Sequence, residues 1–181
     1  RPLIYADYTA SGRSLTFIED YVREALLPTY GNTHTMTSST GRQSSDFVAE
    51  ARTMAKNYMR CGKHDRLLFA GSGATAGANR LVAMLGLTAP TVAARDAARE
   101  LPEAERPLVI TGPYEHHSNM LPWRDSVADV VSIDEDESGG VDLGALKAML
   151  VANAHRRLLI GAFSAASNVT GIITNVDSVT A

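Results

Sequence analysis

The second part of the chain alternates between short apolar runs and amphipathic segments. Four apolar runs have the length of buried strands: 66–70, 108–111, 129–133 and 158–163. Helices are expected between and after them: 73–85, a stretch within 89–106, one from about Ser118, one capped by Asp142, and a short one capped by Asp177. Strands separated by helices favour right-handed crossovers, so we expect an α/β fold with a mostly parallel sheet and flanking helices.

The first part of the chain has fewer regularly spaced apolar positions. A helix is predicted over 17–27, followed by a Ser-, Thr- and Gly-rich loop over 31–45. From 46 to 60 the apolar residues recur at helical spacing, with Ser45 or Asp46 as the expected N-cap.

The composition of the chain mainly excludes classes of partner and classes of site. The chain is 45% hydrophobic and 20% charged, its net charge is −3, and its basic residues are scattered. We therefore expect no nucleic-acid partner, no membrane partner and a cytoplasmic location. The chain begins at Arg1 rather than at Met, so the presence of an upstream targeting segment stays an open alternative. A single cysteine excludes an internal disulfide framework and a cysteine-based zinc site.

Ligands of parallel sheets bind at the carboxyl ends of the strands, so the loops 70–75, 111–119 and 163–171 are the candidate site. In the first loop, glycines allow close backbone approach, and Ser72 and Thr75 place hydroxyls beside the first N–H groups of a helix. This combination suits an anion such as phosphate. The motif alone fits equally well a turn that only connects strand to helix.

The second loop carries His116 and His117 directly after Glu115. An imidazole at the open edge of the sheet can stack on a flat ligand, although a lone histidine is more often structural. Adjacent residues of an extended segment point to opposite sides, so at most two of these three could share a metal. Coordination normally needs three or four ligands, and we expect no metal site.

The third loop offers Asn168, whose carboxamide can donate a hydrogen bond to a ligand oxygen. The alternative is that Asn168 and Thr170 only form the turn.

A dinucleotide site is the main alternative from the residues, because Gly71, Gly73 and Gly77 resemble part of a dinucleotide-binding fingerprint. Such a Rossmann-type NAD- or nucleotide-binding domain needs an acid at the end of the next strand, about 20 residues further on. Asp96 has roughly this spacing but lies in a helical stretch, and the next strand ends at Thr111 without an acid. We rank this alternative second.

Five segments together resemble the class V aminotransferase family of pyridoxal-phosphate enzymes, and most of all its cysteine desulfurase and selenocysteine lyase branch. They keep the order and spacing of the family: Tyr5–Ser11, Tyr30–Asn32, Ser72–Thr75, Glu115–Asn119 with Pro122 and Trp123, and Ser167–Gly171. Within the branch's Glu-His-His-Ala-Asn segment, this chain has Ser118 in place of the alanine. The resemblance implies the large domain of fold type I, here incomplete.

The resemblance also implies roles for residues in the second part of the chain. The phosphate of pyridoxal 5′-phosphate is expected at Gly73, Ala74 and Thr75. His116 is expected to stack on the pyridine ring and, as the catalytic residue, to move protons at the substrate. Asn168 is expected to contact the phenolic oxygen of the ring.

The same resemblance divides the chain by function. Residues 1–45 are expected to form an N-terminal active-site and substrate segment in which Ala10 and Asn32 line the substrate side. Residues 46–181 are expected to be the first part of the large cofactor-binding α/β domain. The implied activity is lysis or transfer on a small amino acid by a homodimer.

Two of the family's functional groups have no counterpart in this sequence. The family's cofactor-binding lysine follows a Ser-x-His motif, and none of Lys56, Lys63 and Lys147 has that context. The acid that pairs with the pyridine nitrogen is also missing. We expect both beyond Ala181, in a longer enzyme of which this stretch is an N-terminal portion that is inactive alone. A catalytically inactive family member that only binds partners is the other alternative.

Overall fold

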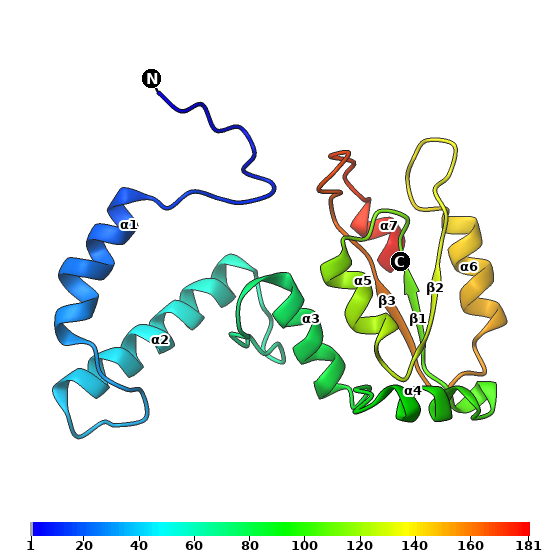
Figure 1. The fold of residues 1–181 in the computed structure, drawn as a ribbon, viewed down its shortest axis with the longest axis horizontal. Coiled ribbons are helices and arrows are strands. Elements are labelled where there is room, and N and C mark those ends of the chain that lie inside the picture. Colours follow the sequence, from blue (N-terminus) through cyan, green and yellow to red (C-terminus); the bar gives the residue numbers. More distant parts are fainter. Residues whose placement is uncertain (1) are drawn as a thin grey trace. The chain divides into compact units, whose positions relative to one another are not determined.

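The computed structural model describes residues 2–181 and divides the chain into two compact units (Figure 1). The first unit ends at Phe69 and the second runs from Ala70 to Ala181. This boundary between compact units differs from the functional boundary predicted after residue 45, and the roles assigned to the two segments stay predictions.

The first unit is helical. Helix α1 (Thr16–Tyr21) continues into a π-helical turn (Val22–Leu26) and a 3-10 turn (Leu27–Thr29). These three pieces together occupy the segment predicted as one helix. Helix α2 spans Ser39–Tyr58.

The start of α2 corrects the predicted cap and the predicted loop. The N-cap is Ser38, whose hydroxyl accepts a hydrogen bond of 3.1 Å from the Gly41 N–H. Ser45 and Asp46 lie inside the helix, so the loop ends at Ser38 rather than at residue 45. The first turns of α2 are polar, and apolar periodicity begins only at Phe47. Apolar spacing alone could not reveal turns that are held by a cap.

The second unit contains a three-stranded parallel sheet in the order β2-β1-β3. Strand β1 is Leu108–Thr111, β2 is Asp129–Ser132 and β3 is Leu159–Ala162. Leu108 is in register with both Asp129 and Leu159. The prediction of an α/β fold with a parallel sheet is therefore confirmed.

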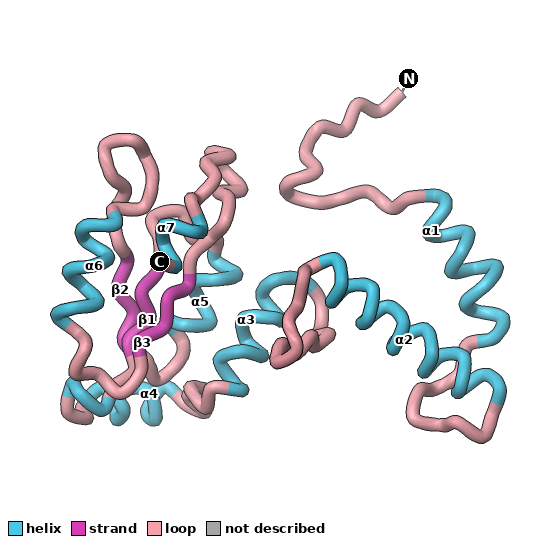
Figure 2. The backbone as a smooth tube through the Cα atoms, turned by 180° about the vertical axis from the view of Figure 1, so that it is seen from behind, coloured by secondary structure: helices cyan, strands magenta, loops and turns pink. Residues whose placement is uncertain are grey.

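Helices cover both faces of this sheet. The helices of the second unit match the predicted positions: α3 (Gly73–Met84), α4 (Val92–Arg99), α5 (His117–Arg124), α6 (Leu143–Ala152) and α7 (Val176–Thr180). The sheet lies between α5 and α6 (Figures 1 and 2). Val82 of α3 and Trp123 of α5 pack with Val109 on one face, and Leu146 of α6 packs with Ile110 on the other. β1 is buried along its whole length because it has a strand on each side and a helix layer on each face.

Two further predicted features are wrong. Residues 66–70 form no strand; Leu68 and Phe69 are 55% and 59% exposed. A strand needs a partner, and the sheet of the described residues pairs only β1, β2 and β3. Asp177 is not the cap of α7, because Asn175 takes that place and accepts a 3.1 Å hydrogen bond from the Ser178 N–H. Asp177 lies in the first turn, where a carboxylate also favours the helix dipole.

Within residues 2–181, no helix has both the length and the apolar character needed to cross a membrane.

An ion-pair cluster joins the amino ends of the three strands. Asp129, which opens β2, accepts hydrogen bonds from Arg106, just before β1, and from Arg156, shortly before β3. Arg156 is 8% exposed and also donates to Glu103 at 2.7 Å. Burial raises the pKa of the Asp129 carboxyl, but the two guanidinium groups outweigh burial and hold that pKa below its ordinary 3.8.

Replacement of Asp129 by Asn is expected to destabilise the second unit by about 1–3 kcal/mol, because Arg156 keeps its charge and loses a partner. The lowered pKa means that Asp129 stabilises the fold fully above the unfolded pKa and less as pH falls through the folded pKa. Urea unfolding followed by Trp123 fluorescence should therefore show a smaller difference between wild type and D129N at pH 3 than at pH 7.

Asp96→Asn is the matched control, because Asp96 is 61% exposed and its arginine contacts are 3.8 and 3.9 Å long. Its expected cost is below about 1 kcal/mol at either pH. An equal loss of stability in both variants would contradict the clustering argument.

Candidate functional site

The carboxyl ends of β1 and β3 open into a shared pocket of about 420 Å³. The loop after β1 lines it with Pro113 to His117, and the loop after β3 lines it with Ser167 to Thr170. Parallel strands that start in register end at the same edge, so these loops must meet there. The pocket therefore brings together His116 and Asn168, which are separated by about fifty residues in the sequence.

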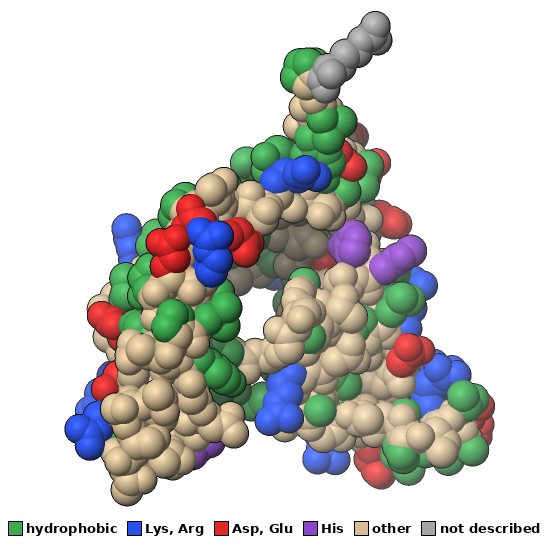
Figure 3. Space-filling model, turned by 60° about the vertical axis from the view of Figure 1, so that its left-hand side comes forward, with side chains coloured by type: hydrophobic (Ala, Val, Ile, Leu, Met, Phe, Trp, Pro, Cys, Tyr) green, Lys and Arg blue, Asp and Glu red, His purple; other side chains and the backbone are tan. Residues whose placement is uncertain are grey.

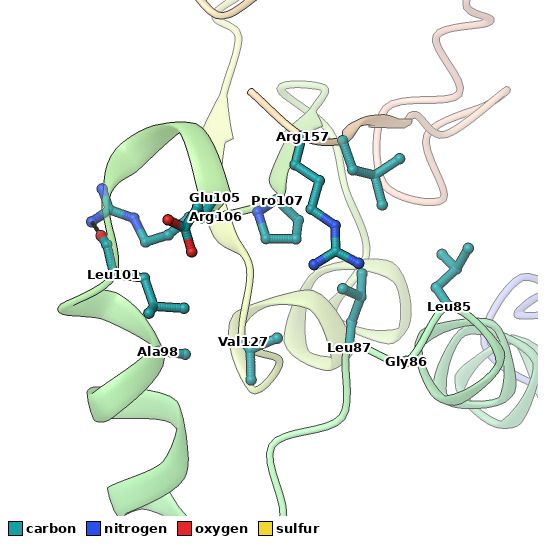
Figure 4. Close-up of a pocket in the computed structure, with 11 residues that line it drawn as sticks. Leu85, Gly86, Leu87, Ala98, Leu101, Glu105, Arg106, Pro107, Val127 and Arg157 are labelled. Carbon is teal, nitrogen blue, oxygen red and sulfur yellow. Dashed lines mark hydrogen bonds between the residues drawn. The ribbon is translucent and has the colours of Figure 1, made fainter. Parts of the chain in front are cut away.

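The amino ends of the strands carry a second, smaller pocket of about 160 Å³ (Figure 4). Leu87, Pro107 and Val127 line it, and the Arg157 side chain reaches between Pro107 and Leu87. This end of a parallel sheet is not where ligands normally bind, and none of the predicted site residues lies there.

The Gly-rich segment before α3 has the backbone expected of an anion site. Gly71 and Gly73 have φ values of +49° and +70°, which favour glycine. A Cβ on Gly71 would lie 2.8 Å from the Ala76 Cβ, whereas the space in front of Gly73 is open. Ser72 is the N-cap, but its side chain makes no capping hydrogen bond. The first N–H groups of α3, at Gly73, Ala74 and Thr75, thus have no side-chain cap.

His116 is the N-cap of α5, a role that the sequence analysis missed. Its Nδ1 accepts a 3.1 Å hydrogen bond from the Ser118 N–H and lies 3.0 Å from the Ser118 hydroxyl. A backbone N–H can only donate, so Nδ1 is unprotonated and a neutral ring carries its proton on Nε2. Histidine is not among the usual N-cap residues, so no sequence signal marked this position.

Both histidines of this loop are exposed, and histidine side chains stand at the molecular surface in Figure 3. The rings of His116 and His117 lie 6.2 Å apart and are tilted by 46°. His117 also lines a neighbouring pocket that contains Thr75 and Ser118. Across residues 2–181, no three His, Cys, Asp or Glu side chains group as metal ligands.

Glu115 ties the two loops of the pocket together. Its carboxylate accepts hydrogen bonds from the Ser164 N–H at 2.6 Å, the Ser164 hydroxyl at 2.8 Å and the Asn119 amide at 2.7 Å. Asn119 in turn accepts a 3.2 Å bond from the buried indole of Trp123. From the sequence, the only chemical role considered for Glu115 was that of a metal ligand, but in the structure it anchors the loop after β1 to the loop after β3.

The turn that carries Asn168 is formed by its neighbours. The Ser167 hydroxyl accepts from the N–H groups of Val169 and Thr170 at 3.3 and 3.2 Å, and Gly171 has a φ of +73°. In residues 2–181, the Asn168 side chain makes no hydrogen bond, although it lines the pocket. The carboxamide of Asn168 is therefore available to a ligand.

Tyr114 fixes a further wall of the pocket. Its hydroxyl contacts the Glu135 carboxylate and, at 2.9 Å, the Gly139 carbonyl oxygen, both in the segment between β2 and α6. The hydrogen bond to Glu135 raises the pKa of the Tyr114 hydroxyl above its ordinary 10.0, because only the neutral hydroxyl can donate that bond, and repulsion between the two negative charges adds to the shift.

Thr75 joins this constellation through Ser118. The Thr75 hydroxyl donates a 2.8 Å hydrogen bond to the Ser118 hydroxyl, which lies beside His116. The structure thus links the start of α3, the imidazole and the pocket that Asn168 lines. Ala10 and Asn32 belong to the first compact unit, where Ala10 ends a turn begun at Asp7 and Asn32 is exposed.

Comparison with known proteins decides the family. The sequence model of the family described as aminotransferase class-V matches residues 4–181. The chain belongs to the class V aminotransferase family. The predicted family is confirmed, and the dinucleotide-binding alternative is not supported.

One curated relative of this chain and one solved structure with a similar fold are both described as cysteine desulfurases. The cysteine desulfurase SufS of Plasmodium falciparum (isolate 3D7) is 22% identical over 184 residues, which cover 99% of this chain and 31% of the relative. The crystal structure of the cysteine desulfurase CsdA (S-sulfonic acid) from Escherichia coli superposes with a TM-score of 0.65 at 18% identity, over 96% of this chain and 40% of that one. The class V chain therefore shares the fold and spans about a third of the length of its curated relative.

Replacement of Glu115 by Gln tests the link between the two loops. The amide would place a donor against the Ser164 or Asn119 donors, so we expect a loss of about 1–3 kcal/mol in local stability. Amide hydrogen exchange of residues 163–171 should accelerate, while that of β1 stays unchanged.

Glu137→Gln is the matched control, because Glu137 is exposed and its carboxylate accepts no hydrogen bond from residues 2–181. If E115Q left exchange in 163–171 as slow as E137Q does, the proposed anchoring by Glu115 would be wrong.

Proposed function

We propose that this chain supplies the phosphate-, ring- and oxygen-binding groups of a pyridoxal 5′-phosphate site in a cysteine desulfurase-like or aminotransferase enzyme. Class V aminotransferases depend on this cofactor. The observation that carries the proposal is the hydrogen-bonded link from Thr75 through Ser118 to His116, beside the pocket that Asn168 lines.

The residues present fit such a cofactor chemically. The N–H groups of Ala74 and Thr75, the Thr75 hydroxyl and the open approach at Gly73 suit a phosphate at the positive end of the α3 dipole. The flat, exposed imidazole of His116 suits a pyridine ring, and the unpaired carboxamide of Asn168 suits its phenolic oxygen. When bound, the cofactor supplies an electron sink for bonds that break at the substrate amino acid.

The capping role of His116 divides the work between its two nitrogens. Nδ1 holds the ring in place through Ser118, which leaves Nε2 as the nitrogen that can exchange a proton with a substrate. His116 is thus proposed both to stack on the cofactor and to move protons.

The substrate side is proposed to involve Ala10 and Asn32 in a homodimer that acts on a small amino acid. None of the three lysines lies at the carboxyl end of a described strand: Lys56 is in α2, Lys63 lies between α2 and α3, and Lys147 is in α6. The proposal therefore assigns covalent attachment of the cofactor to none of them.

Addition of pyridoxal 5′-phosphate to the full-length protein should produce an absorption band in the violet that borohydride removes. Thr75→Ala should weaken binding at least about tenfold, because a hydrogen bond to a charged phosphate contributes about 1.5–3 kcal/mol. Thr53→Ala, which removes only a 2.9 Å bond within α2, is the control and should bind normally. Absence of the band in wild type would refute the cofactor assignment.

Two substitutions separate the roles of His116. His116→Phe keeps an aromatic face and should retain cofactor affinity to within about threefold, since stacking contributes only about 1 kcal/mol. His116→Asn keeps a side chain that can cap α5 but lacks the ring, so it should bind the cofactor more weakly. Turnover of an amino acid should fall in both variants because both lack Nε2. A fully active H116F would rule out proton movement by this residue.

A further inference from the structure

The hydroxyl of Ser118 occupies the middle of a directional chain of hydrogen bonds. Thr75 donates to Ser118 at 2.8 Å, and Ser118 lies 3.0 Å from Nδ1 of His116. Because the Ser118 N–H also donates to this nitrogen, Nδ1 must accept from the hydroxyl as well. The order of donation is therefore Thr75 to Ser118 to His116.

This series of hydrogen bonds depends on Ser118, a residue that departs from the family's Glu-His-His-Ala-Asn segment. Ser118 stands where the Glu-His-His-Ala-Asn pattern has alanine, and a methyl group could neither accept from Thr75 nor donate to His116. Thr75 and Ser118 lie 43 positions apart and meet because α3 packs against α5. The serine thus adds a connection between two helix starts that alanine would not provide.

An anion bound beside Thr75 would change these hydrogen bonds. The Thr75 hydroxyl has one hydrogen, which it gives either to Ser118 or to an anion at the start of α3. An anion that takes this hydrogen leaves the Ser118 oxygen without its donor. Hydrogen bonds in a chain strengthen one another, so loss of the first weakens the second, and every proton stays on its own oxygen.

We propose that Ser118 is a positioning residue whose hydroxyl holds the His116 ring and transmits to it whether the anion position beside Thr75 is occupied. The proposal rests on the phosphate position of the proposed function. It adds to that function a coupling between phosphate binding and the orientation and hydrogen bonding of the imidazole.

The competing explanation is that Ser118 only stabilises the first turn of α5. Its N–H bond to Nδ1 would survive any side-chain change and would keep the cap. A merely structural hydroxyl would therefore leave the His116 nitrogen signals independent of anion binding. The dependence of the His116 nitrogen signals on anion binding therefore distinguishes the two explanations.

The experiment follows the ring nitrogens of His116 by NMR in full-length protein labelled with ring-15N histidine, above pH 8, with and without inorganic phosphate. In wild type, phosphate should shift the Nδ1 signal as the Ser118 bond weakens. In S118A the starting signal should already be displaced, and the phosphate-induced shift should shrink at least fivefold. S118T, which restores a hydroxyl, should recover most of the response.

Ser178→Ala is the matched control, since Ser178 also lies in the first turn of a helix and is exposed. It should respond to phosphate as wild type does. Alanine belongs to the related segment at position 118, so S118A is expected to fold. A phosphate response in S118A equal to that of wild type would overturn the proposal, and so would a wild type whose His116 ignores phosphate.

The absorption band of added pyridoxal 5′-phosphate separates this inference from the proposed function. A normal band together with an unchanged phosphate response in S118A refutes the coupling and leaves the cofactor assignment intact. A Ser118-dependent phosphate response without any band refutes the cofactor assignment and supports the coupling for a different anion. With both intact, S118A should bind inorganic phosphate up to about fivefold more tightly than wild type, because the Thr75 hydroxyl no longer has to give up its hydrogen bond to Ser118.

Discussion

Parallel pairing of β1 with strands on both sides is the constraint on which the second unit depends. Leu108 faces the first residues of both β2 and β3, and all four residues of β1 are buried. Strands of equal length that start together also end together, so their loops open at one edge. A slip in the register of β1 with β3 would move one loop along the sheet and separate His116 from Asn168.

The two ends of the sheet use polar groups in different ways. At the amino ends, Asp129 and its two arginines join three strand starts through charge. At the carboxyl ends, Glu115 is surrounded by donors from Ser164 and Asn119. An acid with its oxygens engaged in this way can fix two loops beside an anion position while the donors offset part of its charge. Rigid anchoring of this kind lets surface loops hold a site with defined geometry.

Elements with a local signal could be predicted from the sequence, and those that depend on distant partners could not. β1 and the cap of α6 by Asp142 follow from an apolar run and from a common capping residue. The run 66–70 has the same apolar character as β1, but strand formation depends on a neighbour that no short segment specifies. Likewise, the motifs indicated the candidate site residues, whereas the anchoring by Glu115 and the bridging by Ser118 depend on contacts between loops.

The cap of α5 illustrates why the unexpected contacts concentrate at the site. An ordinary cap such as Asn or Ser would satisfy the first turn of α5 equally well and would leave no ring at the sheet edge. A histidine in the cap position uses one nitrogen for the helix and leaves available the other nitrogen of a ring that lines the pocket. Because α5 also carries Ser118, the structural hydrogen bonds of the helix start and the chemistry of the imidazole share the same atoms. The usual preference for helix caps is thus broken at the edge of the candidate pocket, where a ligand can use the difference.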